Sequence, residues 1–220
     1  ISEIENYDYQ LEELDKELKS KEEEAFRLAA ELSENRIRAF EGMKNQIEQL
    51  LQQMGMPNAS FVVRHNKKEE LSSEGLDEIV FLFSANRQVD PQELSKIASG
   101  GEMSRVMLAL KYIISQHSTL PTIIFDEIDS GVSGEIAYKM GNILKQLSDR
   151  MQVINITHLP QIAGKGDQHY RVYKKENKDA THTHIKVLDY EERIEELAKM
   201  LSGEELTEAA LSNARELLNT

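Results

Sequence analysis

The sequence of 220 residues contains no cysteine. This absence excludes disulfide bonds and thiolate metal sites, and it fits a reducing compartment without proving one. There is no apolar run of about 18 residues or more, so no membrane-spanning helix and no membrane partner are expected. The sequence also lacks an initiating methionine and a basic-then-apolar leader. We therefore expect no secretory signal, and the start in mid-pattern at Ile1 suggests a fragment of a longer protein.

Positive charge is also scarce. The 26 basic residues are outnumbered by 39 acidic ones, which gives a formal net charge of −13. This balance argues against a broad basic surface that wraps DNA. Any contact with nucleic acid is expected to be local, or to be made by parts of the protein outside this sequence. Hydrophobic residues make up 40% of the chain and charged residues 30%, which is typical of a soluble, helix-rich protein with a buried core.

The first part of the chain has the repeat of a coiled coil. Apolar residues recur every seven positions, with a second series between them and Glu or Lys in the remaining places, which is typical of a coiled-coil seam. The two series are Ile4, Leu11, Leu18, Ala25 and Leu32, and Tyr7, Leu14, Lys21 and Leu28. The phase slips over residues 35–39 and the pattern then resumes at Phe40, which we interpret as a local change of supercoil. An ordinary pair of amphipathic helices is the alternative.

Gly55-Met56-Pro57 is expected to end the helix. After it, the heptad pattern gives way to short apolar runs that alternate with helical segments. Strands are predicted at 61–63, 79–83, 122–125 and 153–156, a hairpin at 170–174 and 184–188, and helices at 101–116, 134–148, 190–201 and 204–218. Alternating apolar strands and helices indicate an α/β fold with a largely parallel sheet and flanking helices. The predicted domains are a coiled-coil arm segment at 1–57 and an α/β lobe at 58–220.

Two adjacent acids end one of the apolar strands. Asp126 and Glu127 follow Thr122–Phe125, and the carboxyl edge of such a sheet is where α/β proteins bind ligands. Asp126 is suited to hold Mg²⁺, directly or through water. Glu127 is suited to orient or deprotonate a water molecule. The alternative is that the two acids merely begin a loop.

A Gly-Gly pair opens the helix that precedes this strand. Ser99, Gly100, Gly101 and Glu102 stand at its start. The glycines let a ligand approach the backbone closely, and the free N–H groups of a helix start attract anions. The alternative is a tight turn with no ligand.

A third polar pair follows the strand at 153–156. His158 comes after Thr157 and is placed to donate to a phosphate oxygen from the edge of the sheet. A histidine at a strand end is otherwise a structural residue.

The order of these three signals resembles the second half of an ATP-binding-cassette ATPase: a signature sequence, a Walker B strand and a switch histidine. The coiled coil upstream resembles the SMC-like branch. The runs Lys96–Lys111, Phe125–Gly134 and Thr157–Ala163 resemble the RecN family of bacterial DNA repair proteins. The resemblance covers about residues 50–220, and over 1–50 it is only coiled-coil character.

The resemblance implies a C-terminal lobe of an ATPase head with ATP and Mg²⁺ as cofactors. Ser99, Gly100 and Gly101, with Glu102 beside them, would contact the γ-phosphate of ATP held by a second head. Asp126 would assist Mg²⁺, Glu127 would be the general base and His158 would sense the γ-phosphate. The implied partners are an N-terminal lobe of the same protein, a second head in an ATP sandwich, and DNA.

No phosphate loop of the form G-x-x-x-x-G-K-[ST] occurs in the sequence. We therefore expect this chain alone to hydrolyse little or no ATP until the lobe with that loop completes it. The implied role is recombinational repair of DNA double-strand breaks in the bacterial cytoplasm, at the nucleoid. The alternatives are another SMC- or Rad50-like ATPase of DNA maintenance, and a non-catalytic coiled-coil scaffold. Asp129 and Ser133 receive no assigned role, although Asp129 could cap the following turn or couple two heads.

Overall fold

The computed structural model describes residues 2–96, 99–117, 120–177, 180–203 and 205–219. The chain folds into two compact units. The first unit comprises Ile1–Glu48 and Ala59–Lys96, and the second comprises Gln49–Asn58 and Ile97–Thr220. Within the described ranges, no helix is long and apolar enough to cross a membrane.

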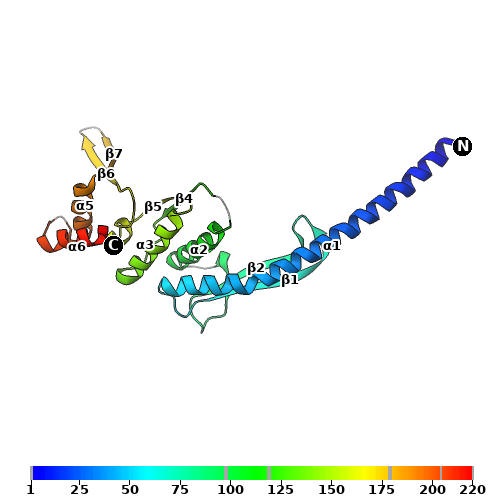
Figure 1. The fold of residues 1–220 in the computed structure, drawn as a ribbon, viewed down its shortest axis with the longest axis horizontal. Coiled ribbons are helices and arrows are strands. Elements are labelled where there is room, and N and C mark those ends of the chain that lie inside the picture. Colours follow the sequence, from blue (N-terminus) through cyan, green and yellow to red (C-terminus); the bar gives the residue numbers. More distant parts are fainter. Residues whose placement is uncertain (1, 97–98, 118–119, 178–179, 204, 220) are drawn as a thin grey trace. The chain divides into compact units, whose positions relative to one another are not determined.

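The long N-terminal helix predicted by the heptad pattern is present. Helix α1 spans Ser2–Gln53, and Gly55, with a φ of 80°, closes it in the left-handed conformation that glycine adopts readily. In Figure 1 the first part of α1 runs on past the other elements of the first unit. The apolar seam there is 41–67% exposed at Tyr7, Leu11, Leu14, Leu18, Leu28 and Leu32. The long helix is confirmed, whereas its pairing into a coiled coil stays a prediction.

An antiparallel hairpin runs along the later part of α1 (Figure 1). It consists of β1 (Ser60–Ser72) and β2 (Gly75–Ser84), and a short β3 (Gln92–Glu93) pairs with β2 before the 3₁₀ helix η1 (Leu94–Lys96). These strands are longer than the predicted ones, because the polar middle of the hairpin also pairs. At the tip, Gly75 has a φ of 90°, and a Cβ there would lie 3.7 Å from the Cβ of Ala29. The tight turn thus lies directly on the helix.

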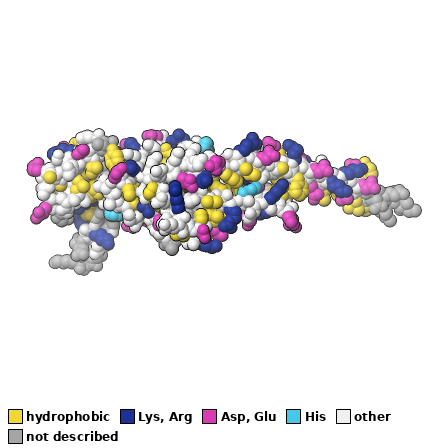
Figure 2. All heavy atoms as spheres, turned by 90° about the horizontal axis from the view of Figure 1, so that it is seen from below, with side chains coloured by type: hydrophobic (Ala, Val, Ile, Leu, Met, Phe, Trp, Pro, Cys, Tyr) yellow, Lys and Arg dark blue, Asp and Glu magenta, His cyan; other side chains and the backbone are white. Residues whose placement is uncertain are grey.

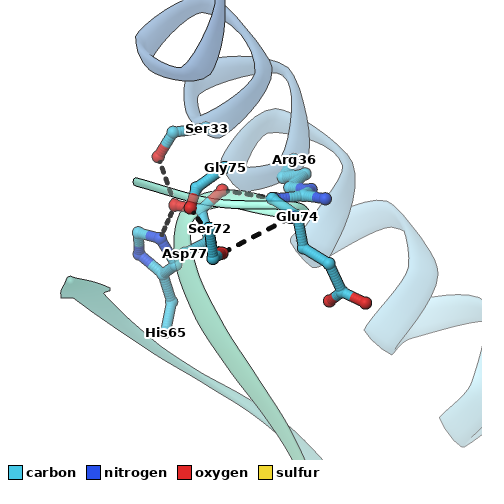
Figure 3. A network of polar contacts seen from close by, with 7 residues as sticks. All are labelled: Ser33, Arg36, His65, Ser72, Glu74, Gly75 and Asp77. Carbon is cyan, nitrogen blue, oxygen red and sulfur yellow. Dashed lines mark hydrogen bonds and ion pairs between the residues drawn. The ribbon is translucent and has the colours of Figure 1, made fainter. Parts of the chain in front are cut away.

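A buried carboxylate fixes this hairpin to α1 (Figure 3). The side chain of Asp77 is fully buried. Its Oδ1 accepts a hydrogen bond from the Ser33 hydroxyl at 2.7 Å and lies 2.6 Å from His65 Nε2. Its Oδ2 accepts from Arg36 Nη1 at 2.8 Å. Hydrogen bonds from His65, Ser33 and Arg36 hold the pKa of Asp77 well below its usual range. We call these four residues the Asp77 clamp.

The phase slip over 35–39 lies within the part of α1 that packs on the hairpin. Beyond it, the apolar stripe of α1 faces the hairpin. Phe40 lies 5.9 Å from the His65 ring, Ile47 is fully buried, and Glu48 accepts a hydrogen bond from the backbone N–H of Phe61 at 2.9 Å. Because Ala29, Ser33 and Arg36 already face the hairpin before the slip, the hairpin-facing stripe of α1 runs through it.

The second unit contains the one parallel pair of strands among the described residues. Strands β4 (Thr122–Asp126) and β5 (Gln152–Ile156) are parallel and in register from Thr122–Gln152 to Asp126–Ile156. Helix α3 (Gly134–Ser148) packs against β5 and against α2 (Gly100–Ser115). The core of these elements contains Val106, Leu108, Ala109, Phe125, Ala137, Met140, Ile143, Leu144 and Leu147.

The elements that follow β5 complete the second unit. Helix α4 (Pro160–Ala163) leads to an antiparallel hairpin, β6 (Tyr170–Asn177) and β7 (Ala180–Val187). Helix α5 (Tyr190–Ser202) starts with a capping box of Asp189 and Glu192, and α6 (Glu208–Asn219) packs on it. The α/β class is confirmed. Of the largely parallel sheet that was predicted, β4 and β5 form the parallel part, whereas the other described strands pair antiparallel. The domain division at 57/58 stays a prediction.

Candidate active site

The parallel pairing brings two of the predicted motifs to one edge. Asp126 is the last residue of β4 and pairs in register with Ile156, the last residue of β5. The backbone N–H of Glu127 then donates to the carbonyl of Ile156 at 3.1 Å. Since His158 follows Ile156 by two residues, the two acids and the histidine lie at the same carboxyl edge. Both acids and the histidine are exposed.

Glu127 has an unusual backbone. Its φ is 49°, and among the described residues it is the one non-glycine residue with a positive φ. This conformation costs a non-glycine residue about 1 kcal/mol or more. Such strain is retained where the surrounding structure needs a side chain in a particular direction. The outlier therefore marks Glu127 as a functional candidate independently of its position in the motif.

The start of α2 lies against the loop that follows β4. A Cβ on Gly101 would meet the carbonyl oxygen of Ser130 at 2.7 Å, so only glycine fits there. A Cβ on Gly100 would meet nothing within 4 Å. Ser99 is the N-cap residue, yet its side chain makes no capping hydrogen bond. Gly101 is thus explained by packing within the chain, whereas Gly100 and the Ser99 hydroxyl lie open to a ligand. Ile97 and Ala98, just before them, lie outside the described residues.

Glu102 has an electrostatic partner within its own helix. Burial lowers the pKa of Arg105, and the negative charge of Glu102 acts in the opposite direction. Arg105 Nε is buried and has no hydrogen-bond partner in the described part of the chain. Glu102 therefore compensates Arg105 in this structure.

The sequence left one buried group at this edge without a role. The side chain of Asp129, in the loop between β4 and α3, is fully buried. It accepts a hydrogen bond from the hydroxyl of Thr157. Asp129 comes two residues after Glu127 and directly after the apolar Ile128. That position is the signal in the sequence that could have indicated its burial.

The oxygen ligands of this edge fit Mg²⁺. Asp126 offers an exposed carboxylate at the strand end and makes no ion pair with any described residue. Magnesium in phosphate-handling sites is bound by one or two carboxylates, with waters and substrate phosphates completing its shell. No group of three or more potential metal ligands occurs within the described ranges. The edge thus suits a nucleotide-bound Mg²⁺ and not a metal held by protein ligands alone.

The fold resembles part of an Smc head domain. The chain is similar to the Smc head domain with coiled coil and joint from Pyrococcus yayanosii, with a TM-score of 0.55 and 18% identity, over 76% of this chain and 30% of that one. It is also similar to the Smc head domain of Pyrococcus furiosus, described as bound to the C-terminal domain of ScpA. That match has a TM-score of 0.51 and 18% identity, over 76% of this chain and 39% of that one.

The chain belongs to the family described as the RecF/RecN/SMC N terminal domain, whose sequence model matches residues 6–181. Its relatives include proteins named DNA repair protein RecN. The one from Rickettsia bellii is 44% identical over 89% of this chain and 36% of its own length. The one from Haemophilus influenzae is 41% identical over 87% of this chain and 34% of its own length. The chain thus spans about a third of the length of these relatives.

Proposed function

We propose that this chain is the C-terminal lobe of the ATPase head of a RecN-type DNA repair protein. One observation carries the proposal: the strand acids, the Thr157–His158 turn and the start of α2 are neighbours in a single compact unit. The parallel pairing of β4 with β5 joins the first two, and the contact of Gly101 with Ser130 joins the third. In sequence these motifs are separated by more than 20 residues each. They converge only because the chain folds as an α/β layer.

One face of the parallel pair is bare, and this supports an absent N-terminal lobe as partner. Ile124 is 63% exposed and Ile156 53% exposed, and Ile154 is exposed on the same face. Parallel strands are normally covered on both faces. The phosphate loop required for ATP binding is also missing from the sequence. A lobe that covers this face and carries that loop would supply both.

The site residues receive the following roles in this proposal. Ser99 and Gly100, with Gly101 behind them, contact the γ-phosphate of ATP bound to a second head. The negative charge of Glu102 offsets the positive charge of Arg105 on the same helix. Asp126 holds the Mg²⁺ of the subunit's own nucleotide, which would offset phosphate charge in the transition state. Glu127 accepts a proton from the attacking water, and His158 contacts the γ-phosphate. ATP engages the two heads, and hydrolysis separates them.

The relatives named DNA repair protein RecN support a role in DNA repair. We propose that this role is recombinational repair of DNA double-strand breaks in the bacterial cytoplasm, at the nucleoid. On the face shown in Figure 2, basic and acidic side chains are interspersed. This distribution favours local DNA contacts over one extended basic surface. The segment 1–57 would be part of a coiled-coil arm and 58–220 the lobe itself. The lobe alone would hydrolyse little ATP.

The test is the substitution Glu127→Gln in the full-length protein, compared with wild type. Loss of the base should lower the ATP turnover rate by about 100-fold or more. ATP binding should persist, so a stable ATP-bound dimer of heads should be visible by size-exclusion chromatography. Glu135→Gln is the matched control, because Glu135 is an exposed acid of α3 that pairs with Lys139 on its own helix. Normal turnover with glutamine at 127 would refute the assignment of the base.

A further inference from the structure

Asp129 is the most deeply buried acid near the candidate active site. Its side chain is 0% exposed, and a carboxylate is buried completely only where partners compensate its charge. It lies in the loop that follows Glu127, and its backbone carbonyl accepts a hydrogen bond from the Val132 N–H at 3.2 Å. The side chain takes no part in that turn, which argues against the expectation that Asp129 caps it.

The carboxylate of Asp129 instead faces the loop that carries His158. Its Oδ2 accepts the hydrogen bond from the Thr157 hydroxyl. The same hydroxyl accepts a hydrogen bond from the Leu159 N–H at 3.0 Å. Asp129 and Thr157 therefore hold the backbone on both sides of His158. The loop after β4 and the loop after β5 are joined through this one carboxylate.

The second oxygen of Asp129 has no partner. Oδ1 is buried and accepts no hydrogen bond from the described residues. The ring of His158 lies close by, with Nδ1 at 3.9 Å from Oδ2. Within the part of the chain that the structure describes, this is the one ion-pair contact of Asp129. At 3.9 Å it is too long for a hydrogen bond, but the side chain of His158 is 67% exposed, so its ring has room to turn.

We propose that Asp129 is a positioning residue for His158, accepting a hydrogen bond from Nδ1–H and directing Nε2 away from the buried carboxylate. A carboxylate on one ring nitrogen fixes the tautomer and orientation of the imidazole. When Nδ1–H reaches Oδ1, the contact gives this unpartnered oxygen the donor that a buried oxygen requires. The contact between the two residues stands by itself, whereas its effect on turnover rests on the proposed ATPase function.

The first experiment measures the contact without reference to activity. The full-length protein is labelled with ¹⁵N-histidine, and the His158 ring signals are assigned with His158→Gln. Above neutral pH, wild type should show a protonated Nδ1 at His158. Asp129→Asn should move the proton to Nε2, the usual site in free imidazole side chains. Asp77→Asn is the matched control, since it also removes a buried carboxylate but should leave the His158 signals unchanged. Identical His158 signals in wild type and Asp129→Asn would overturn the proposal.

The second experiment measures the consequence for turnover. Asp129→Asn should lower kcat about 10- to 100-fold, as loss of an orienting partner does, with KM for ATP changed less than the rate. In a His158→Ala background the same substitution should have little further effect. Losses that multiply in the double variant would show that Asp129 acts through the general fold and would overturn the proposal. If wild type has no ATPase activity but the NMR signature is present, the proposed function fails while the positioning contact stands.

Discussion

At the scale of single residues, the Asp77 clamp shows how burial and charge act together. Three donors from α1 and β1 surround one carboxylate, and they hold the pKa of Asp77 well below its usual range. A carboxyl group whose pKa is lowered by folding stabilises the folded state above its unfolded pKa, about 3.9. That contribution is lost as the pH falls through the lower, folded-state value.

We therefore expect Asp77→Asn to reduce the free energy of unfolding at neutral pH by about 2 kcal/mol, because hydrogen bonds to a charged group are lost. The difference between wild type and variant should shrink as the pH is lowered below about 4. Urea titrations followed by circular dichroism between neutral and acidic pH measure this. Asp90→Asn, at an exposed site, is the control and should follow wild type throughout. A constant difference at all pH values would contradict the ionic origin of the effect.

At the scale of elements, α1 has an exposed apolar seam in its first part and a buried stripe that packs on the hairpin. Before residue 29 the heptad seam lies exposed, whereas Ala29, Ser33 and Ile47 are buried on the stripe that faces the hairpin side. The sequence predicted one helix and a slip in its pattern. It could not show which side of the helix the hairpin covers, because the hairpin comes about 30 residues later in the chain and leaves no trace in the local repeat.

The exposed seam predicts a second helix in the full-length protein. The chain has no cysteine, so one can be placed at will. Leu18→Cys on the seam should react with a maleimide several-fold more slowly in the full-length protein than in the isolated 220-residue chain, since a partner helix would cover it. Glu23→Cys, on the side of the helix opposite the seam, should react equally fast in both. Equal rates for Leu18→Cys in the two proteins would exclude a paired arm at this position.

In the hairpin and in the candidate active site, too, local residue patterns predicted some features, whereas others depend on tertiary contacts. The bounds of β4 and β5 to within one residue, the helix at 134–148 and the acids at the end of β4 follow from apolar patterning, and the sequence predicted them. The polar residues Arg64–Lys67 do not look like a strand, yet they form one through pairing with residues 77–80 of β2. The burial of Asp129 and its contact with Thr157 depend on two loops that meet across the sheet edge. Only tertiary structure brings such groups together, so residue patterns could not indicate them.

At the scale of the whole molecule, β4 and β5 leave one face exposed, which the proposed N-terminal lobe would cover. Ile124 is exposed there, so Ile124→Asn should change the stability of the isolated chain by no more than about 0.5 kcal/mol. In the full-length protein, where another lobe would cover the residue, the same substitution should cost about 2 kcal/mol or more. Thermal unfolding of both proteins measures the difference. Val89→Asn, also an exposed apolar site, is the control and should have a small effect in both. A small effect of Ile124→Asn in both would argue against a covering lobe.

The length of the first part of α1 is independent of the packing between the later part and the hairpin. Because the hairpin is attached only from Ala29 onward, residues before it set the reach of the helix without touching that attachment. Removing seven of them would shorten the helix by about 10 Å and turn the remaining seam by only about 20°. Removing four would turn it by about 40°. The length of α1 can therefore be changed in steps of one heptad. Comparing a set of such deletions would measure the distance that the helix has to span.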